Sequence, residues 1–211
     1  MLAPRKKLHS SPSSVLDLVN EWVSPLLRPG DVVCDIGCGD GRVLLHLAKQ
    51  LTSGACHMDK ISFVGIDINP DRVQEAIQSL SSAKEEGTIH PNVSVVFHCA
   101  NAMESIDLYK DATFVFLYLI PRGLKIFKPM LYQVLQHQQQ QKEKKKLDKN
   151  RDNDENVNDN VSDQSVMIRV MTYMAPLPDE KYTRKGSCHV EHQPGAAWPV
   201  YFYELCPSMI D

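Results

Sequence analysis

Two strand-to-helix junctions, spaced one βα unit apart, constrain the fold of this chain more than any other feature. At the first, a short buried strand expected over 31–36 meets glycines at alternate positions of 37–41, directly before a segment with helical apolar spacing. Glycine lets the backbone turn tightly between a strand and a helix, and it leaves no side chain across the turn. At the second, an apolar strand ends at Asp67, and Pro70 stands where a helix would begin. Together the junctions predict neighbouring βα units of a parallel sheet.

The same alternation runs along most of the chain. It predicts strands over 31–36, 62–67, 93–98 and 112–118, helices over 41–51, 70–84 and 122–136, and an amphipathic helix over 14–27 ahead of the first strand. Such alternation predicts an α/β fold in which helices cover both faces of a parallel sheet. Segments 166–174 and 199–205 are further expected strands, and 181–191 is a candidate antiparallel partner for the last of them.

The residues around the glycines indicate which nucleotide such a turn would bind. A dinucleotide-binding turn reads G-x-G-x-x-G, whereas this chain has G-x-G-x-G preceded by Asp35 inside the strand. A carboxylate at Asp35 would repel a pyrophosphate but suits the ammonium group of a methionine moiety. Asp67, at the end of the next strand, can accept both hydroxyls of a ribose. The pattern therefore predicts a site for S-adenosylmethionine, with a purely structural strand-to-helix turn as the alternative.

Three segments carry a resemblance to a known family. Asp35-Ile-Gly-Cys-Gly-Asp-Gly-Arg and Gly65-Ile-Asp-Ile-Asn-Pro-Asp-Arg-Val resemble the class I S-adenosylmethionine-dependent methyltransferases. With Phe116-Leu-Tyr-Leu-Ile-Pro they look like the protein-lysine methyltransferases that act on the ATP synthase c-subunit and the adenine nucleotide translocator, and their bacterial relatives. The resemblance implies a Rossmann-like α/β fold: a mostly parallel sheet with helices on both faces and a C-terminal antiparallel hairpin.

The cofactor contacts expected from these motifs fall into three groups. Asp35 and the backbone of the glycine turn should hold the methionine end, Asp67 the ribose, and Ile68 one face of the adenine. By resemblance, Asn101 and Ala102 should meet the adenine amino edge, although an Asn-Ala pair is also an ordinary loop turn. The predicted cofactor-binding residues are Asp35, Gly37, Cys38, Gly39, Asp67, Ile68, Asn101 and Ala102.

The segment Tyr118-Leu-Ile-Pro121 lies beyond the fourth expected strand, and the resemblance places it beside the methyl group to be transferred. Tyr118 and Pro121 are therefore the predicted catalytic residues. Tyr118 can present its ring to an alkylammonium group, or its hydroxyl to an incoming amine. The alternation along 114–118 leaves open the alternative that Tyr118 turns into the core.

A lysine acceptor must lose a proton before it attacks, because its ammonium form has no lone pair. No general base stands out in the sequence. Glu104, Asp107 and Asp179 lie in loops expected near strand ends, and each also fits the plainer interpretation of a solvated surface charge. We expect the proton to leave through water.

Composition narrows the classes of partner. The formal net charge of -3 and the pI near 6.2 give no general attraction to nucleic acid. The six cysteines form no C-x-x-C pair and the eight histidines no H-x-x-x-H pair, so no metal site is predicted. No apolar run reaches the roughly 20 residues of a transmembrane helix. We expect a monomer that acts on a lysine side chain of a protein substrate.

The chain divides into four segments with different expectations. Residues 1–11 form a flexible basic N-terminal tail, which also has the composition of a mitochondrial targeting peptide, so a mitochondrial or cytoplasmic location is expected. Residues 12–136 form the cofactor-binding core. The Gln-, Lys- and Asp-rich stretch 137–165 is predicted to be a disordered insertion, with docking of a partner on the lysines of 142–146 as the alternative. Residues 166–211 supply the last strands of the same domain.

Three functions remain open at this point. The favoured one is S-adenosylmethionine-dependent protein-lysine N-methylation. The first alternative is methylation of a small metabolite or an RNA base, because the same sheet serves many acceptors. The second is a non-catalytic protein with this fold that binds the cofactor and acts through partner contacts.

Overall fold

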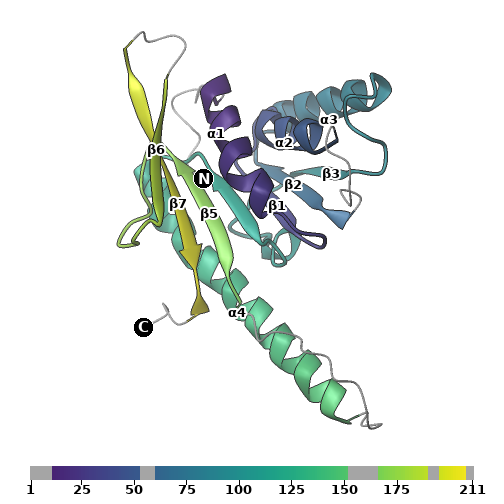
Figure 1. The fold of residues 1–211 in the computed structure, drawn as a ribbon, viewed down its shortest axis with the longest axis vertical. Helices are drawn as coiled ribbons and strands as arrows, with labels where there is room; N and C mark the ends of the chain where they lie inside the picture. The colour runs from purple at the N-terminus through teal and green to yellow at the C-terminus, as the bar shows by residue number, and fades with distance from the viewer. Residues whose placement is uncertain (1–10, 53–59, 152–165, 190–194, 208–211) are drawn as a thin grey trace.

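A computed structural model describes residues 11–52, 60–151, 166–189 and 195–207. They form a seven-stranded sheet in the order β3-β2-β1-β4-β5-β7-β6, shown in Figure 1. The strands are β1 (Val32–Ile36), β2 (Ser62–Asp67), β3 (Ser94–Cys99), β4 (Phe114–Leu117), β5 (Ile168–Tyr173), β6 (Arg184–His189) and β7 (Ala197–Leu205). The helices are α1 (Ser13–Val23), α2 (Arg42–Thr52), α3 (Pro70–Glu85) and α4 (Pro121–Arg151), with short 3-10 turns η1 (Ser24–Leu26) and η3 (Ile106–Leu108).

The sheet is parallel from β3 to β5 and antiparallel at its C-terminal end. Strand β1 pairs in parallel with both β2 and β4, and β5 continues the parallel order beside β4. Strand β7 then pairs antiparallel with β5, and β6 pairs antiparallel with β7 at the sheet edge. This arrangement confirms the predicted α/β fold with a C-terminal antiparallel hairpin, which is the class I methyltransferase fold.

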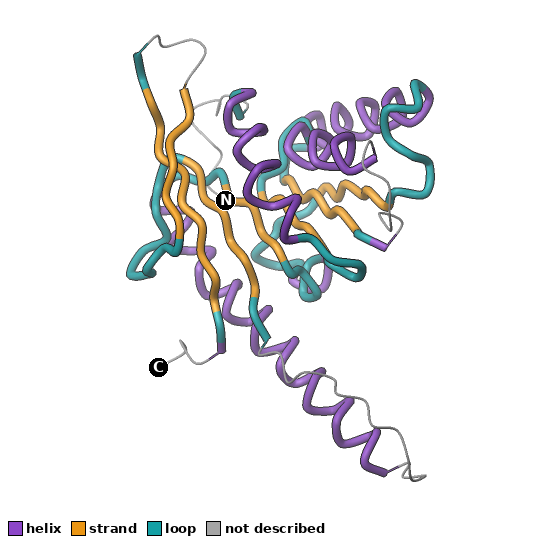
Figure 2. The backbone as a smooth tube through the Cα atoms, viewed as in Figure 1, coloured by secondary structure: helices purple, strands orange, loops and turns teal. Residues whose placement is uncertain are grey.

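Helices cover both faces of the sheet, as Figures 1 and 2 show. One hydrophobic core joins α1, α2 and α3 to one face, and a second core joins α4 to the other. Alternation along the strands divides the side chains between the two cores: in β1, Val33 belongs to the first core and Cys34 to the second. A central strand covered on both faces is mainly apolar, and Asp35 is the one charged residue of β1.

Local sequence accounts for the start of α3 immediately after β2. Asn69 is its N-cap, and its side-chain oxygen accepts hydrogen bonds from the amides of Asp71 at 3.0 Å and Arg72 at 3.3 Å. Pro70 occupies the first helical position, where its missing amide costs nothing and its φ already suits the helix. The turn between β2 and α3 is therefore short and well determined.

The structure corrects the prediction for the end of α4. The helix was expected to stop at 136 and to be followed by disorder from 137, but it continues without a break to Arg151 and projects from the domain in Figure 1. Gln and Lys are good helix formers, and extending a helix that packing has already nucleated adds a hydrogen bond for each residue ordered. The side chain of Gln138 also donates to the Ala112 carbonyl at 2.9 Å. Residues 152–165 and the tail 1–10 lie outside the described residues.

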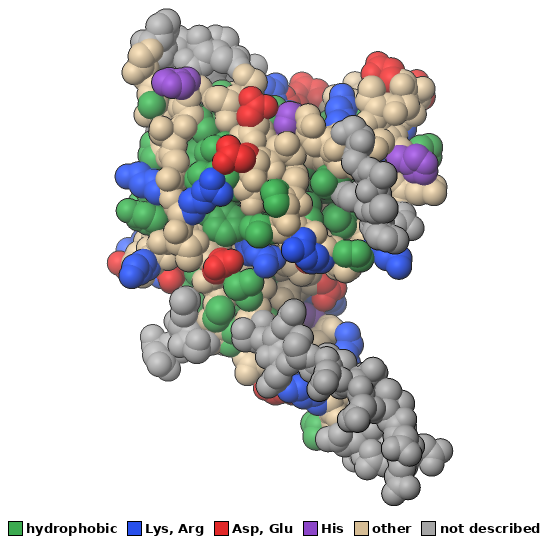
Figure 3. Space-filling model, viewed as in Figure 1, with side chains coloured by type: hydrophobic (Ala, Val, Ile, Leu, Met, Phe, Trp, Pro, Cys, Tyr) green, Lys and Arg blue, Asp and Glu red, His purple; other side chains and the backbone are tan. Residues whose placement is uncertain are grey.

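Surface charge is mixed on the face that Figure 3 shows, where Lys and Arg side chains are interspersed with Asp and Glu. This distribution is in keeping with the small net charge of -3. Among the described helices, none combines the length and the apolar character that a crossing of the bilayer requires.

Candidate active site

The carboxyl ends of β1, β2 and β4 meet at one edge of the sheet, because β1 lies between the other two in parallel register. The predicted site residues follow directly from these ends. The glycine turn 37–41 follows β1, Ile68 follows β2, and Tyr118 follows β4, while Asn101 lies just beyond β3, the neighbour of β2. Parallel sheets bind ligands beyond the carboxyl ends of their strands. The fold therefore brings residues from four separate parts of the sequence to one edge.

The backbone amides of the glycine turn are already bonded within the protein. Gly37 and Cys38 donate to the carbonyl of Ile66, at 2.8 and 3.1 Å, and Gly39 donates to a carboxylate oxygen of Asp67 at 2.9 Å. What Gly37, Cys38 and Gly39 offer to a methionine end is therefore their carbonyl oxygens. Those are the partners that an ammonium group needs, because it donates hydrogen bonds and accepts none.

Two glycines of the turn have different structural roles. At Gly41, with φ +74°, a Cβ would lie 2.6 Å from the ring of Phe97 and 2.9 Å from Ala76, so only glycine lets α2 begin against β3 and α3. At Gly39, with φ +55°, a Cβ would meet nothing within 4 Å. Both positions favour glycine for their left-handed backbone. Gly39 therefore leaves open space beside the turn, whereas Gly41 serves the packing of the domain.

Asp67 ties the end of β2 to the glycine turn. One of its carboxylate oxygens accepts from the amide of Gly39, and the other accepts from the amide of Asn69 at 2.8 Å. Each carboxylate oxygen has two lone pairs, so one remains on each oxygen for a ribose hydroxyl. The geometry fits the predicted ribose contact and shows that Asp67 also orders the turn.

Asp35 is a buried carboxyl group, 2% exposed, in the middle of the sheet. Burial raises its pKa to about 8, and the negative charges of Asp67 and Asp40 add to the shift. Within the described part of the chain, no lysine, arginine or histidine forms an ion pair with it. A cation beside Asp35 would stabilise its ionised form, so the position fits the predicted contact with an ammonium group.

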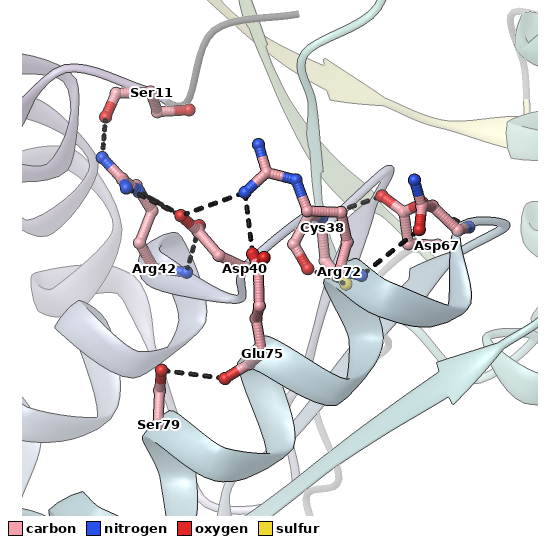
Figure 4. Close-up of polar contacts among 10 residues, drawn as sticks. Ser11, Cys38, Asp40, Arg42, Asp67, Arg72, Glu75 and Ser79 are labelled. Atoms are coloured by element: carbon pink, nitrogen blue, oxygen red, sulfur yellow. Dashed lines mark hydrogen bonds and ion pairs between the residues drawn. The ribbon is translucent and has the colours of Figure 1, made fainter. Parts of the chain in front are cut away.

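Asp40, in contrast, lies in a network of arginines, shown in Figure 4. Its carboxylate pairs with Arg42 at 2.7 Å and with Arg72 at 3.9 Å, and Arg72 also pairs with Glu75 at 2.9 Å. Arg42 donates further to the carbonyl of Ser11 at 3.2 Å. The network joins the glycine turn to α3 and to Ser11, two residues before α1. Sequence reasoning missed it, and the only available signal was the charged pair at positions 40 and 42 beside the glycines.

The side expected to bind adenine is more open. Ile68 is 55% exposed directly after β2, so its side chain is free to cover a flat ring. Asn101 and Ala102 follow β3, but the Asn101 amide group is used locally: it donates to Glu104 at 2.8 Å and accepts from the amide of Met103 at 3.1 Å. Asn101 therefore forms the ordinary loop turn that was its alternative interpretation. A role of its side chain in binding adenine remains a prediction.

Tyr118 lies at the edge between the core and the site. It is partly buried, and its ring packs on that of Tyr173 with centroids 4.8 Å apart and planes inclined at 59°. Burial raises the pKa of Tyr118, so its hydroxyl stays protonated and neutral at physiological pH. Pro121 is exposed and is the first residue of α4, a position that proline favours for its backbone conformation alone.

The sequence of this chain is similar to those of known methyltransferases. A family model described as "Methyltransferase domain" matches residues 27–143, more than half of the chain. The chain belongs to this methyltransferase family. A protein-lysine N-methyltransferase of Saccharolobus islandicus is 30% identical over 106 residues, which are 50% of this chain and 56% of that protein. A ribosomal protein L11 methyltransferase of Burkholderia thailandensis is 39% identical over 62 residues, 29% of this chain and 18% of that protein.

Solved structures support the same fold. An RNA methyltransferase of Salinibacter ruber in complex with S-adenosyl-L-homocysteine matches with a TM-score of 0.59 and 22% identity, over 94% of both chains. An S-adenosylmethionine-dependent O-methyltransferase of Thermotoga maritima matches with a TM-score of 0.52 and 13% identity, over 96% of this chain and 68% of the other. The methyltransferase domain thus has the class I fold, for which S-adenosylmethionine is the cofactor, as the sequence motifs predicted.

The carboxylates considered as general bases occupy different surroundings in the methyltransferase domain. Glu104 accepts a hydrogen bond from the side-chain amide of Asn101. The side chain of Asp107 is 85% exposed and pairs with Lys110 at 3.0 Å. Asp179 is exposed in the loop after β5. Their positions agree with the simpler interpretation of surface charges. In the ranges that the structure describes, no three His, Cys, Asp or Glu side chains gather as a metal site would require.

Proposed function

We propose that this methyltransferase domain transfers a methyl group from S-adenosylmethionine to the side-chain nitrogen of lysine in a protein. The observation that carries the proposal is the position of Tyr118, a partly buried aromatic residue at the carboxyl end of β4 and next to the glycine turn. The residue after it, Leu119, lies 3.6 Å from where a Cβ of Gly37 would stand. The similarity to a protein-lysine N-methyltransferase over 106 residues supports the same acceptor class.

On the cofactor side, the chain offers acceptors where the ligand has donors. The Asp35 carboxyl and the carbonyls of the turn around Gly37 and Gly39, with Cys38 between them, are assigned to the methionine end. Asp67 is assigned to the ribose hydroxyls, and exposed Ile68 to the adenine ring. When bound, the sulfonium cofactor supplies an electrophilic methyl group that the acceptor nitrogen attacks in line with the bond to sulfur.

On the acceptor side, Tyr118 provides a surface that suits a lysine side chain. Its ring can lie against the methylene chain and the charged nitrogen that methylation produces, and its neutral hydroxyl can accept a hydrogen bond from the amine. Glu104, Asp107 and Asp179 fit the interpretation of surface charges, so we assign no side chain as general base. The lysine loses its proton to water before attack.

The test uses purified full-length protein, methyl-labelled S-adenosylmethionine, and hypomethylated mitochondrial and cytosolic extracts. Label in a discrete protease-sensitive band that yields methyl-lysine on hydrolysis supports the proposal. Label in nuclease-sensitive or low-mass material contradicts the lysine assignment and favours an RNA base or a small metabolite. Tight cofactor binding without labelling of any fraction favours the non-catalytic alternative.

A further inference from the structure

Two tyrosines stand side by side at the carboxyl edge of the sheet. Strands β4 and β5 are parallel neighbours, with Leu117 opposite Thr172. The next residue along the chain is Tyr118 in one case and Tyr173 in the other, so the two tyrosines come together. Their rings are the tilted pair with centroids 4.8 Å apart. Tyr173 is only 2% exposed, whereas Tyr118, which directly follows β4, is partly buried.

The hydroxyls of this pair keep their hydrogen-bonding capacity. In the described ranges, neither Tyr118 nor Tyr173 forms a hydrogen bond through its hydroxyl. Other tyrosines of the same domain do: Tyr109 donates to the Ala102 carbonyl at 2.7 Å, and Tyr203 accepts from the Leu177 amide at 2.8 Å. Two phenol hydroxyls that keep their hydrogen-bonding capacity, placed beside a proposed reaction site, can bind a ligand there.

The backbone after Tyr173 holds its ring in place. Met174 has φ +72°, in the left-handed region that side chains other than glycine rarely adopt, and its amide donates to the Pro199 carbonyl at 2.8 Å. Thr172, on the other side, is fully buried and donates to the Ala175 carbonyl at 2.7 Å. Strain of this kind persists only where the surrounding contacts enforce it, and it is frequent at functional sites.

The loop that follows is fastened to α4. Lys128 pairs with Glu180 at 2.8 Å and donates to the Pro178 carbonyl at 2.7 Å, and Tyr132 donates to the same glutamate. Because α4 begins three residues after Tyr118, these contacts join the segment after Tyr118 to the loop after Tyr173. The segments that follow the two tyrosines are therefore joined to each other.

We propose that the hydroxyls of Tyr118 and Tyr173 together bind the acceptor nitrogen, which makes Tyr173 a second acceptor-contacting residue; this inference rests on the proposed lysine methylation. A neutral lysine amine has two N–H groups and one lone pair. If each N–H donates to one phenol oxygen, the lone pair is left in a single direction, toward the methyl carbon. The new N–C bond forms from that lone pair, the C–S bond breaks with its electrons on sulfur, and the product ammonium releases a proton to water.

The pKa shifts agree with neutral hydroxyls. Burial raises the pKa of Tyr173 to about 12, and electrostatic interactions with Tyr118 and Cys188 contribute to this shift. Both phenols therefore remain protonated at the pH values at which a lysine acceptor is methylated. Each phenol oxygen keeps lone pairs that can accept a hydrogen bond from an amine N–H. Neither phenol competes with water as the proton acceptor.

The test compares Tyr173→Phe, Tyr118→Phe and the double variant with Tyr201→Phe. Tyr201 is a matched control: it is 9% exposed on the neighbouring strand β7, it forms no hydroxyl hydrogen bond in the described residues, and it belongs to the core on the opposite face. The assay measures methyl-lysine formed with labelled S-adenosylmethionine and a limiting amount of hypomethylated extract. Cofactor affinity is measured separately by calorimetry.

We expect Tyr173→Phe to lower the rate about tenfold, as loss of one hydrogen bond does, with cofactor affinity and melting temperature equal to those of Tyr201→Phe. The double variant should lose less than the product of the two single losses, because both hydroxyls bind one nitrogen. The monomethyl fraction of the product should also fall, since a monomethylated amine keeps one N–H for the remaining hydroxyl.

Two results overturn the inference without touching the proposed function: a Tyr173→Phe rate equal to that of Tyr201→Phe, or a rate loss that is fully explained by weaker cofactor binding. Absence of methyl-lysine from the wild-type reaction overturns the proposed function, and this inference with it.

Discussion

The carboxylate of Asp67, at the end of β2, accepts a hydrogen bond from the backbone amide of Gly39, 2.9 Å away in the turn after β1. The bond connects the two motifs that marked the sequence, and it holds open the space beside Gly39. The residue assigned to the ribose therefore also shapes the turn assigned to the methionine end. Changes at Asp67 should act on both ends of the cofactor site.

Asp67→Ala should abolish measurable cofactor binding. The change removes the acceptor for two backbone amides and for the ribose hydroxyls, and each charge-assisted hydrogen bond contributes about 1.5–3 kcal/mol. Isothermal calorimetry with S-adenosylmethionine measures the loss. Asp71→Ala, in the exposed first turn of α3, is the matched control and should bind as the wild type does. Equal affinities of the two variants would contradict the assignment of Asp67.

The pKa of Asp35 predicts how the stability of the cofactor-free protein depends on pH. Its folded pKa of about 8 lies above the unfolded value, so the folded state holds more protons between the two values. Stability should therefore fall as pH rises from about 4 to about 8, by up to about 1.4 kcal/mol per pH unit from this group, and change no further above it.

Urea unfolding at a series of pH values tests this dependence. Asp35→Asn should flatten the profile, because an amide stays neutral at every pH. Asp148→Asn, at an exposed position of α4, should leave the slope as it is in the wild type. A wild-type profile that rises through this window would show that Asp35 is ionised in the folded protein.

Gly41→Ala and Gly39→Ala should distinguish the glycine that serves the packing of the domain from the glycine that serves cofactor binding. At Gly41 the new methyl group would overlap the ring of Phe97 and the side chain of Ala76, so we expect a loss of about 2–4 kcal/mol in unfolding free energy. At Gly39 the space is open, and we expect about 1–2 kcal/mol from backbone strain together with weaker cofactor binding. Chemical denaturation and calorimetry report the two quantities. The reverse order of stabilities would contradict these roles.

Removal of residues 141–164, with the shortened α4 joined back toward β5, should leave cofactor affinity unchanged. The deleted part of the helix lies beyond Gln138, whose hydrogen bond to the Ala112 carbonyl ties α4 to the domain. The carboxyl ends of β1, β2 and β4 lie at the opposite end of the sheet from this tie, so the site should not be affected. Calorimetry with the deletion variant is the measurement, and a large loss of affinity would show that this segment supports the site.

Several features of the site could be predicted because they are local. These features lie within short segments whose local structure depends on near neighbours. They are the glycine spacing, the acidic residue inside β1 and the acidic residue that ends β2. The sequence Asn69-Pro70 likewise predicts its own helix start, since the cap and the proline act on adjacent turns. The helix end at 136 was wrong, because composition alone does not show that the nucleated helix α4 can extend through polar residues.

What the sequence determined by itself was the order of strands and helices and the chemistry of its two glycine and aspartate motifs, because hydrophobic period and backbone preference depend on near neighbours. Tertiary structure alone decided which distant groups meet. It placed Tyr173 against Tyr118 and gave Asp40 two arginines, whereas among the described residues it gave Asp35 no cation. It also engaged amides of the glycine turn in hydrogen bonds. The physical reason is that strand order and register set these contacts, and both follow from the burial of the whole sheet between its two helical layers.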